Sequence, residues 1–152
     1  TSFAGSQHLM VGTFKALIRE LVGNLRDHGV GRIAILNTGV STEKALDEVA
    51  AELGEVAVLH MRLLGASADT LFDVLDGGHA DERETSVMLA LDPRGVRMNR
   101  LVPEGDFKVT GATGDASRAS AFKGERLLDA RTEDMVAALR RRWPDAFAVA
   151  GV

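Results

Sequence analysis

The sequence contains no cysteine and no apolar run long enough to cross a bilayer. A chain without cysteine can form no disulfide and can use no thiolate as a nucleophile or as a metal ligand. A segment resembling a signal peptide, with a charged start and an apolar stretch, is missing as well. These absences predict a cytoplasmic protein that has no membrane partner.

An excess of basic residues is also lacking, because 22 aspartates and glutamates outnumber 18 lysines and arginines, for a formal net charge of -4. An acidic chain has no electrostatic reason to bind nucleic acid. What is present is apolar material: 45% of the 152 residues are hydrophobic, which suffices for one core. We therefore expect a single domain over residues 1–152 and no nucleic-acid partner.

Apolar residues recur at helical and strand spacing along the chain. From Val11 to His28, side chains such as Phe14, Ile18 and Val22 share one face, which is typical of an amphipathic helix. Further helices are expected over residues 41–53, 82–91 and 119–143, and strands over residues 32–36 and 56–61. This order predicts an α/β fold with a largely parallel sheet and helices on its faces.

The loop after the first strand, NTGVST (residues 37–42), lies where an open α/β sheet collects its ligands. Gly39 permits a tight turn there, and Ser41 or Thr42 can cap the next helix, whose first amides attract an anion. Such residues are also typical of a cap that binds nothing. The lysine and glycine spacing of a Walker loop is missing. A phosphate site and a plain cap therefore both stay open.

The stretch DGGHADERETSVMLALDP (residues 76–93) places a histidine among acidic residues ahead of an apolar run. Asp81 and Glu84 match a variant of the helix-capping pattern, which needs no function. Capping does not explain His79, which follows Gly78 at a turn where the main chain can approach a ligand closely. The residues alone leave His79 as either a site residue or a hydrogen-bonded turn histidine.

Four segments, in order, resemble the creatininase family of amidohydrolases. HADERETSVMLALDP (residues 79–93) is similar to the family signature H-x-G-x-x-E-T-S-x-M-L-A-L-x-P. SFAGSQHL (residues 2–9), DHGVGRIAILN (residues 27–37) and GDASRASAFKGERLL (residues 114–128) resemble three further family segments. The resemblance implies a three-layer αβα fold with a largely parallel central sheet.

The resemblance also implies a chemistry, in which one or two divalent metal ions (Zn, Mn or Fe) activate water for attack on a small, often cyclic, amide. It implies that His79 shuttles a proton to the leaving nitrogen and that Glu84 is the carboxylate that orients it. The expected substrate-binding residues are Asn37, Gly39, Ser41 and Gly78. Family members form homo-oligomers, so further copies of the chain are expected as partners besides the small-molecule amide.

The sequence departs from the family pattern at the metal ligands. The family's early E-x-H segment is missing, Gly39 falls on a ligating histidine, and Ser41 falls where a second ligand can occur. Neither His79 nor Glu84 is a primary ligand in the family pattern. We therefore assign no metal ligand in this chain, although the resemblance implies a metal, and expect no tight binding of a metal pair.

Three hypotheses follow. In the favoured one, the sequence is the C-terminal two thirds of an amidohydrolase that lacks its N-terminal strand or strands, in keeping with a chain that begins at Thr1 rather than at methionine. In the second, it is a degenerate relative that binds or assembles without catalysis. In the third, it is a nucleotide-binding α/β module that uses NTGVST and GATGDAS (residues 111–117), although neither loop has dinucleotide spacing.

The aromatic residues bear on the substrate. Phe72 is the only aromatic residue between Gly39 and His79, the span in which creatinine-hydrolysing members have their aromatic pocket residues, so creatinine is not the expected substrate. His60 falls in the second strand run and is assigned no role in the site.

Overall fold

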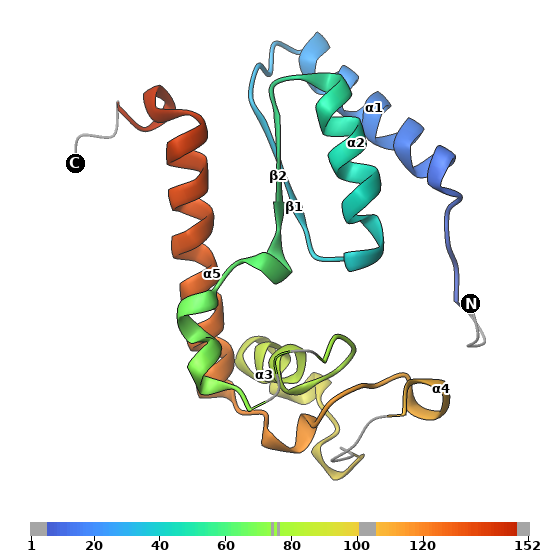
Figure 1. Ribbon diagram of the computed structural model, residues 1–152, viewed down its shortest axis with the longest axis vertical. Helices are drawn as coiled ribbons and strands as arrows, with labels where there is room; N and C mark the ends of the chain where they lie inside the picture. The colour runs from blue at the N-terminus through green and yellow to red at the C-terminus, as the bar shows by residue number, and fades with distance from the viewer. Residues whose placement is uncertain (1–5, 74, 76, 101–105, 149–152) are drawn as a thin grey trace. The chain divides into compact units, whose positions relative to one another are not determined.

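The computed structural model describes residues 6–73, 75, 77–100 and 106–148 (Figure 1). The chain divides into two compact units, one formed by residues 1–63 with residues 137–152 and the other by residues 64–136. The single domain expected over residues 1–152 stays a prediction.

The first unit is built on a two-stranded parallel sheet. Its elements are α1 (Val11–Asp27), β1 (Ile33–Asn37), α2 (Glu43–Leu53) and β2 (Val56–His60). Ile33 lies opposite Val56 and Asn37 lies opposite His60 in the parallel register. The predicted order of helices and strands and the parallel pairing are confirmed, and every boundary lies within two residues of its prediction.

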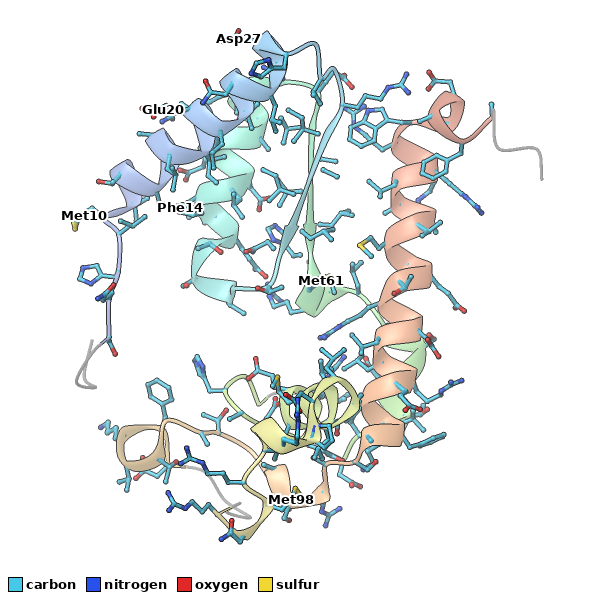
Figure 2. All side chains as sticks on the ribbon, turned by 180° about the vertical axis from the view of Figure 1, so that it is seen from behind. Met10, Phe14, Glu20, Asp27, Met61 and Met98 are labelled. Carbon is cyan, nitrogen blue, oxygen red and sulfur yellow. The ribbon has the colours of Figure 1, made fainter. Side chains whose placement is uncertain are left out.

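A small apolar core joins α1 to both strands. Val22 of α1 is buried in contact with Ile33 and Val56, and burying one such side chain contributes about 1.5–3 kcal/mol. Phe14 lies on the side of α1 that faces α2, whereas Glu20 lies on its outer side (Figure 2). This packing lies at the first residues of both strands, and the parallel pairing places their carboxyl ends at one edge of the sheet, where the loop NTGVST begins.

The second unit is helical in its described part. Its elements include a 3₁₀ helix (Ala66–Leu71), α3 (Glu82–Leu91), the short α4 (Phe107–Thr110) and residues 121–136 of α5 (Ala121–Arg142). Leu127 of α5 is fully buried in a cluster with Ala68 and Phe72. The predicted range of α3 is confirmed, and α5 begins two residues and ends one residue inside its predicted range. No helix among the described residues is long and apolar enough to cross a membrane.

The helices α3 and α5 cross at Gly124. A β-carbon at this position would collide with the carbonyl oxygen of Ser86 and lie 2.9 Å from the Val87 nitrogen. The buried Ser86 hydroxyl accepts a hydrogen bond from the Ser120 main-chain N–H at 3.1 Å, which satisfies an amide ahead of α5. Ser86 and Gly124 belong to segments that carry the family resemblance, and they also form the contact between α3 and α5.

Candidate functional site

The main chain of His79 is hydrogen-bonded at both of its polar groups. Its N–H donates to the Thr113 hydroxyl at 3.0 Å, and its carbonyl accepts from the Thr113 N–H at 2.7 Å. One residue earlier, the Gly78 N–H donates to the Asp81 carboxylate at 2.8 Å. Two segments far apart in sequence thus meet at residues 77–81, hereafter the His79 turn.

Ala80 is the strained residue of the His79 turn. Its φ of +49° lies in the left-handed region, which a residue with a β-carbon adopts at a cost of about 1–2 kcal/mol. The Ala80 N–H donates to the Glu84 carboxylate at 2.6 Å, and its carbonyl accepts from the Thr85 hydroxyl at 3.2 Å. Strain persists only where surrounding bonds over-determine the conformation, and such strain clusters at functional sites.

The His79 side chain points outward from this turn. The residue is exposed, and its ring stacks on Phe107 of α4 with centroids 4.8 Å apart and planes at 37°. Within the part of the chain that the structure describes, neither imidazole nitrogen forms a hydrogen bond. Both nitrogens are therefore available to a ligand or to a proton.

Asp81 and Glu84 begin α3 as the capping pattern predicts. The Asp81 carboxylate accepts a hydrogen bond from the Glu84 N–H at 2.8 Å, so the predicted cap is confirmed. The same carboxylate leaves no room for a β-carbon at Gly77. The Glu84 carboxylate contacts the Ala80 N–H, so it braces the main chain of the turn, and its role at the imidazole stays a prediction.

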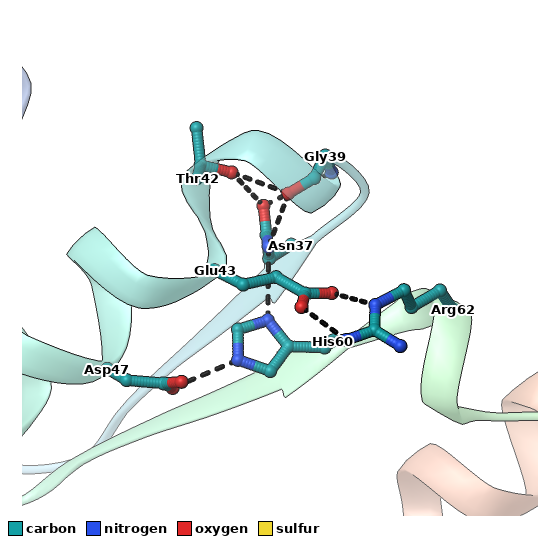
Figure 3. A network of polar contacts seen from close by, with 7 residues as sticks. All are labelled: Asn37, Gly39, Thr42, Glu43, Asp47, His60 and Arg62. Carbon is teal, nitrogen blue, oxygen red and sulfur yellow. Dashed lines mark hydrogen bonds and ion pairs between the residues drawn. The ribbon is translucent and has the colours of Figure 1, made fainter. Parts of the chain in front are cut away.

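Asn37, Gly39 and Ser41 lie in the first unit, in the turn after β1 (residues 37–42, hereafter the Asn37 turn; Figure 3). The Asn37 Oδ1 accepts from the Gly39 N–H at 3.2 Å and lies 2.7 Å from the Thr42 hydroxyl. Its Nδ2 donates to the Gly39 carbonyl at 2.9 Å and lies 3.0 Å from His60 Nδ1. These contacts use both donors and both acceptor positions of the amide. A substrate contact by Asn37 requires one of them to break.

His60 lies beside Asn37, although the sequence assigned it no role in the site. Its Nε2 is 2.9 Å from Asp47 Oδ1. Beside it, Arg62 forms two hydrogen bonds with Glu43, at 2.6 and 2.7 Å, and these hold the pKa of the Glu43 carboxyl below its usual value of 4.5. The signal that could have identified His60 is its place at the end of a strand, because neighbouring parallel strands end at the same edge of a sheet.

One expectation for the Asn37 turn is wrong. The Thr42 side chain does not cap α2, because Thr42 lies in the helical region, with φ -99° and ψ -10°, and its hydroxyl forms no cap hydrogen bond. Gly39 is extended, with φ -110° and ψ 121°, so the turn does not need the conformational freedom of glycine. Space restricts this position instead, since a β-carbon would lie 3.3 Å from Thr42 Oγ1.

The described residues do not fit the metal centre that the resemblance implies. Among residues 6–73, 75, 77–100 and 106–148, no group of three or more histidines, aspartates or glutamates could hold a metal ion. Gly39 has no donor side chain, and the Asn37 amide is already saturated. A catalytic zinc site uses about three protein ligands, so these residues alone cannot form one.

Comparison with known proteins identifies the family. Residues 1–139 match the family described as creatininase, creatinine amidohydrolase. The chain belongs to the creatininase family. No curated protein matches the chain in sequence.

Solved creatininase structures match this creatininase-family chain in fold. A tryptophan-to-phenylalanine mutant of creatininase aligns with a TM-score of 0.77 at 25% identity, over 93% of this chain and 68% of that one. A mutant creatininase complexed with creatine aligns with a TM-score of 0.74 at 24% identity, over 93% of this chain and 69% of that one. A manganese form of creatininase aligns with a TM-score of 0.77 at 24% identity, over 93% and 68%.

These matches confirm the creatininase-like α/β fold predicted from the sequence. Zinc and manganese forms among the matched structures support a divalent metal in the family. Of the predicted site residues, Gly78, His79 and Glu84 gather in the second unit, and Asn37, Gly39 and Ser41 gather in the first.

Proposed function

We propose that this creatininase-family chain carries the proton-transfer and substrate-binding part of an amidohydrolase site, which hydrolyses a C–N bond of a small amide. The observation that supports the proposal is the His79 turn. A strained Ala80 is held by Glu84 and Thr85, and the turn presents an exposed imidazole. Because left-handed residues other than glycine cluster at functional sites, the strained alanine favours a functional turn.

His79 acts in this proposal on the leaving nitrogen. Amide hydrolysis needs a proton at that nitrogen when the C–N bond breaks, because an uncharged amine leaves far more easily than an amide anion. An imidazole can donate such a proton near neutral pH. Thr113 fixes the main chain of His79 and Phe107 fixes the plane of its ring, so the proton donor is already oriented.

Gly78, Gly39 and Ser41 are the proposed substrate contacts. Gly78 has a φ of +138° and open space where a β-carbon would stand, so a ligand can approach its main chain closely. Ser41 presents an exposed side chain. Asn37 acts indirectly, by shaping the Asn37 turn. The water-activating metal of the family would need donors other than the described residues.

The test is turnover of a panel of small cyclic and open-chain amides with added zinc or manganese, read as amine or ammonia release. His79→Ala is expected to lower turnover about 10²- to 10⁴-fold. Its circular dichroism should not change, because the imidazole is exposed. His28→Ala, which changes an exposed histidine after α1, is the matched control and should keep full activity. Equal turnover by wild type and His79→Ala contradicts the proposal.

A second function is favoured by the side chains of the described residues, because no group of three or more of their histidines, aspartates or glutamates could hold a metal ion. In it, the chain is a non-catalytic family relative that acts in binding or assembly. Calorimetric titration with zinc or manganese, combined with the turnover assay, separates the two. No binding and no turnover support the second function, whereas tight stoichiometric binding contradicts the ligand count. A homo-oligomer and a cytoplasmic location remain part of our proposal, and light scattering measures the oligomer.

A further inference from the structure

We infer that His60 is a positioning residue that locks the Asn37 turn by means of one fixed tautomer of its imidazole. The inference rests on the proposed function only where it takes this turn to face the substrate. It is carried by the hydrogen bonds that join Asp47, His60, Asn37 and Gly39 (Figure 3).

The strand register brings the two side chains together. Asn37 and His60 are the last residues of β1 and β2 and lie opposite each other in the parallel pairing. Side chains at matched positions of neighbouring strands lie on the same face of the sheet. Asn37 is 8% exposed and the His60 side chain 11% exposed, so each must find its hydrogen-bond partners within the protein.

The main chain of Gly39 determines which way the Asn37 amide points. The Gly39 N–H lies 3.2 Å from Asn37 Oδ1, and the Gly39 carbonyl lies 2.9 Å from Nδ2. An amide turned by 180° would set its NH₂ group against the Gly39 N–H, and its oxygen against the Gly39 carbonyl. The NH₂ group of Asn37 must therefore be the group that faces His60.

The orientation of the amide then determines the tautomer of His60. Asn37 Nδ2 donates to His60 Nδ1 at 3.0 Å, so Nδ1 carries no proton. The proton lies on Nε2, which donates to Asp47 Oδ1 at 2.9 Å. The other recorded charges around the ring are Glu43 and Arg62, which are bound to each other, so Asp47 is the carboxylate left for the imidazole.

This arrangement ties the Asn37 turn to helix α2. Asp47 of α2 holds the imidazole, the imidazole holds one N–H of Asn37, and Asn37 holds both main-chain groups of Gly39. Without an acceptor at Nδ1, one buried donor of Asn37 is unpaired, and this cost weakens the hold of the amide on Gly39. A turn held in one conformation needs no ordering when a ligand binds.

Two variants of His60 separate the two halves of the imidazole. His60→Asn keeps an acceptor oxygen near the position of Nδ1, whereas His60→Gln keeps a polar group near Nε2 and removes the acceptor beside Asn37. The readouts are nitrogen-15 NMR signals of the ring and hydrogen exchange of the Gly39 amide in the full chain. We expect a protonated Nε2 in the wild type, wild-type Gly39 exchange in His60→Asn, and exchange roughly five- to tenfold faster in His60→Gln.

A wild-type ring protonated at Nδ1 overturns the inference, as does equal Gly39 exchange in wild type and His60→Gln. Amide exchange in α2 reports whether a variant is folded, and if both variants unfold, the wild-type tautomer decides alone. These measurements use the free protein. Failure of the amide assay therefore counts against the proposed function and not against the role of His60.

Discussion

The His79 turn and the Asn37 turn use their polar groups in opposite ways. In the His79 turn, the side chains of Glu84 and Thr113 form hydrogen bonds with the main chain, and the imidazole of His79 is exposed. In the Asn37 turn, an asparagine side chain bonds the main chain, and the nearby imidazole of His60 is bonded at both nitrogens. The His79 imidazole can therefore meet a ligand directly, whereas the His60 imidazole is committed to Asn37 and Asp47.

The two turns also differ in backbone strain. Ala80 has a β-carbon and a φ of +49°, whereas Gly39 has no β-carbon and an ordinary φ of -110°. The residue with the greatest conformational freedom therefore stands where that freedom is not used.

The helix crossing beneath the His79 turn depends on Gly124. Gly124→Ala should lower the free energy of unfolding by about 3 kcal/mol, because main-chain atoms of Ser86 and Val87 cannot move aside easily. The control is Gly23→Ala in α1, where nothing lies within 4 Å of the new β-carbon, and it should raise the free energy by up to about 1 kcal/mol. Urea denaturation measures both. Equal effects would falsify the close crossing.

Exchanging the residue types of the two turns tests the strain directly. Ala80→Gly should raise the free energy of unfolding by up to about 1 kcal/mol, because it removes the left-handed strain. Gly39→Ala should change it by less than about 1 kcal/mol, since its φ is ordinary and the β-carbon meets only side-chain atoms, Thr42 Oγ1 at 3.3 Å and Asn37 Oδ1 at 4.0 Å. Thermal or urea unfolding gives both values, and a destabilised Ala80→Gly contradicts the strain.

Thr113 tests the clamp on His79. Thr113→Val should lower the free energy of unfolding by about 1 kcal/mol and expose the His79 amide to faster exchange, because its acceptor is lost. Thr113→Ser keeps the hydroxyl and should retain wild-type exchange at His79. If the valine and serine variants exchange alike, the hydroxyl does not hold the turn.

The ion pair beside the Asn37 turn predicts a small acid dependence. Arg62 lowers the pKa of Glu43 below 4.5 in the folded chain, so the pair's contribution is complete above the unfolded value and is lost as the pH falls through the folded one. The difference in free energy of unfolding between wild type and Glu43→Gln should therefore become smaller as the pH falls through that acid range. The effect is small because surface ion pairs contribute little. A deficit that stays constant from neutral pH into acid contradicts it.

Much of the fold could be predicted because its signals are local. Within the described residues, the pattern of apolar side chains identified the helices α1, α2, α3 and α5 and the strands β1 and β2, and α3 has the predicted bounds Glu82–Leu91. The cap formed by Asp81 spans three residues and was visible in the same way. The family resemblance was also local, carried by short ordered segments. The cap expected from Thr42 failed because Thr42 ends a 3₁₀ turn and is itself in the helical region rather than extended.

The partners of the site residues could not be predicted. Thr113 lies 34 residues beyond His79, and His60 lies 23 residues beyond Asn37. Phe107 was equally absent from the expected site, because no periodicity links α4 to the His79 turn.

By itself, the sequence determined the order and type of the elements, the capped start of α3 and a glycine at position 39, which the family resemblance aligns with a ligating histidine. Only the tertiary structure decided which imidazole is outward and which is locked, since neither local sequence specifies the partners of its histidine ring. The physical reason is that a polar group takes whichever partner is nearest in space, and that partner comes from strand register and helix crossing rather than from its neighbours along the chain.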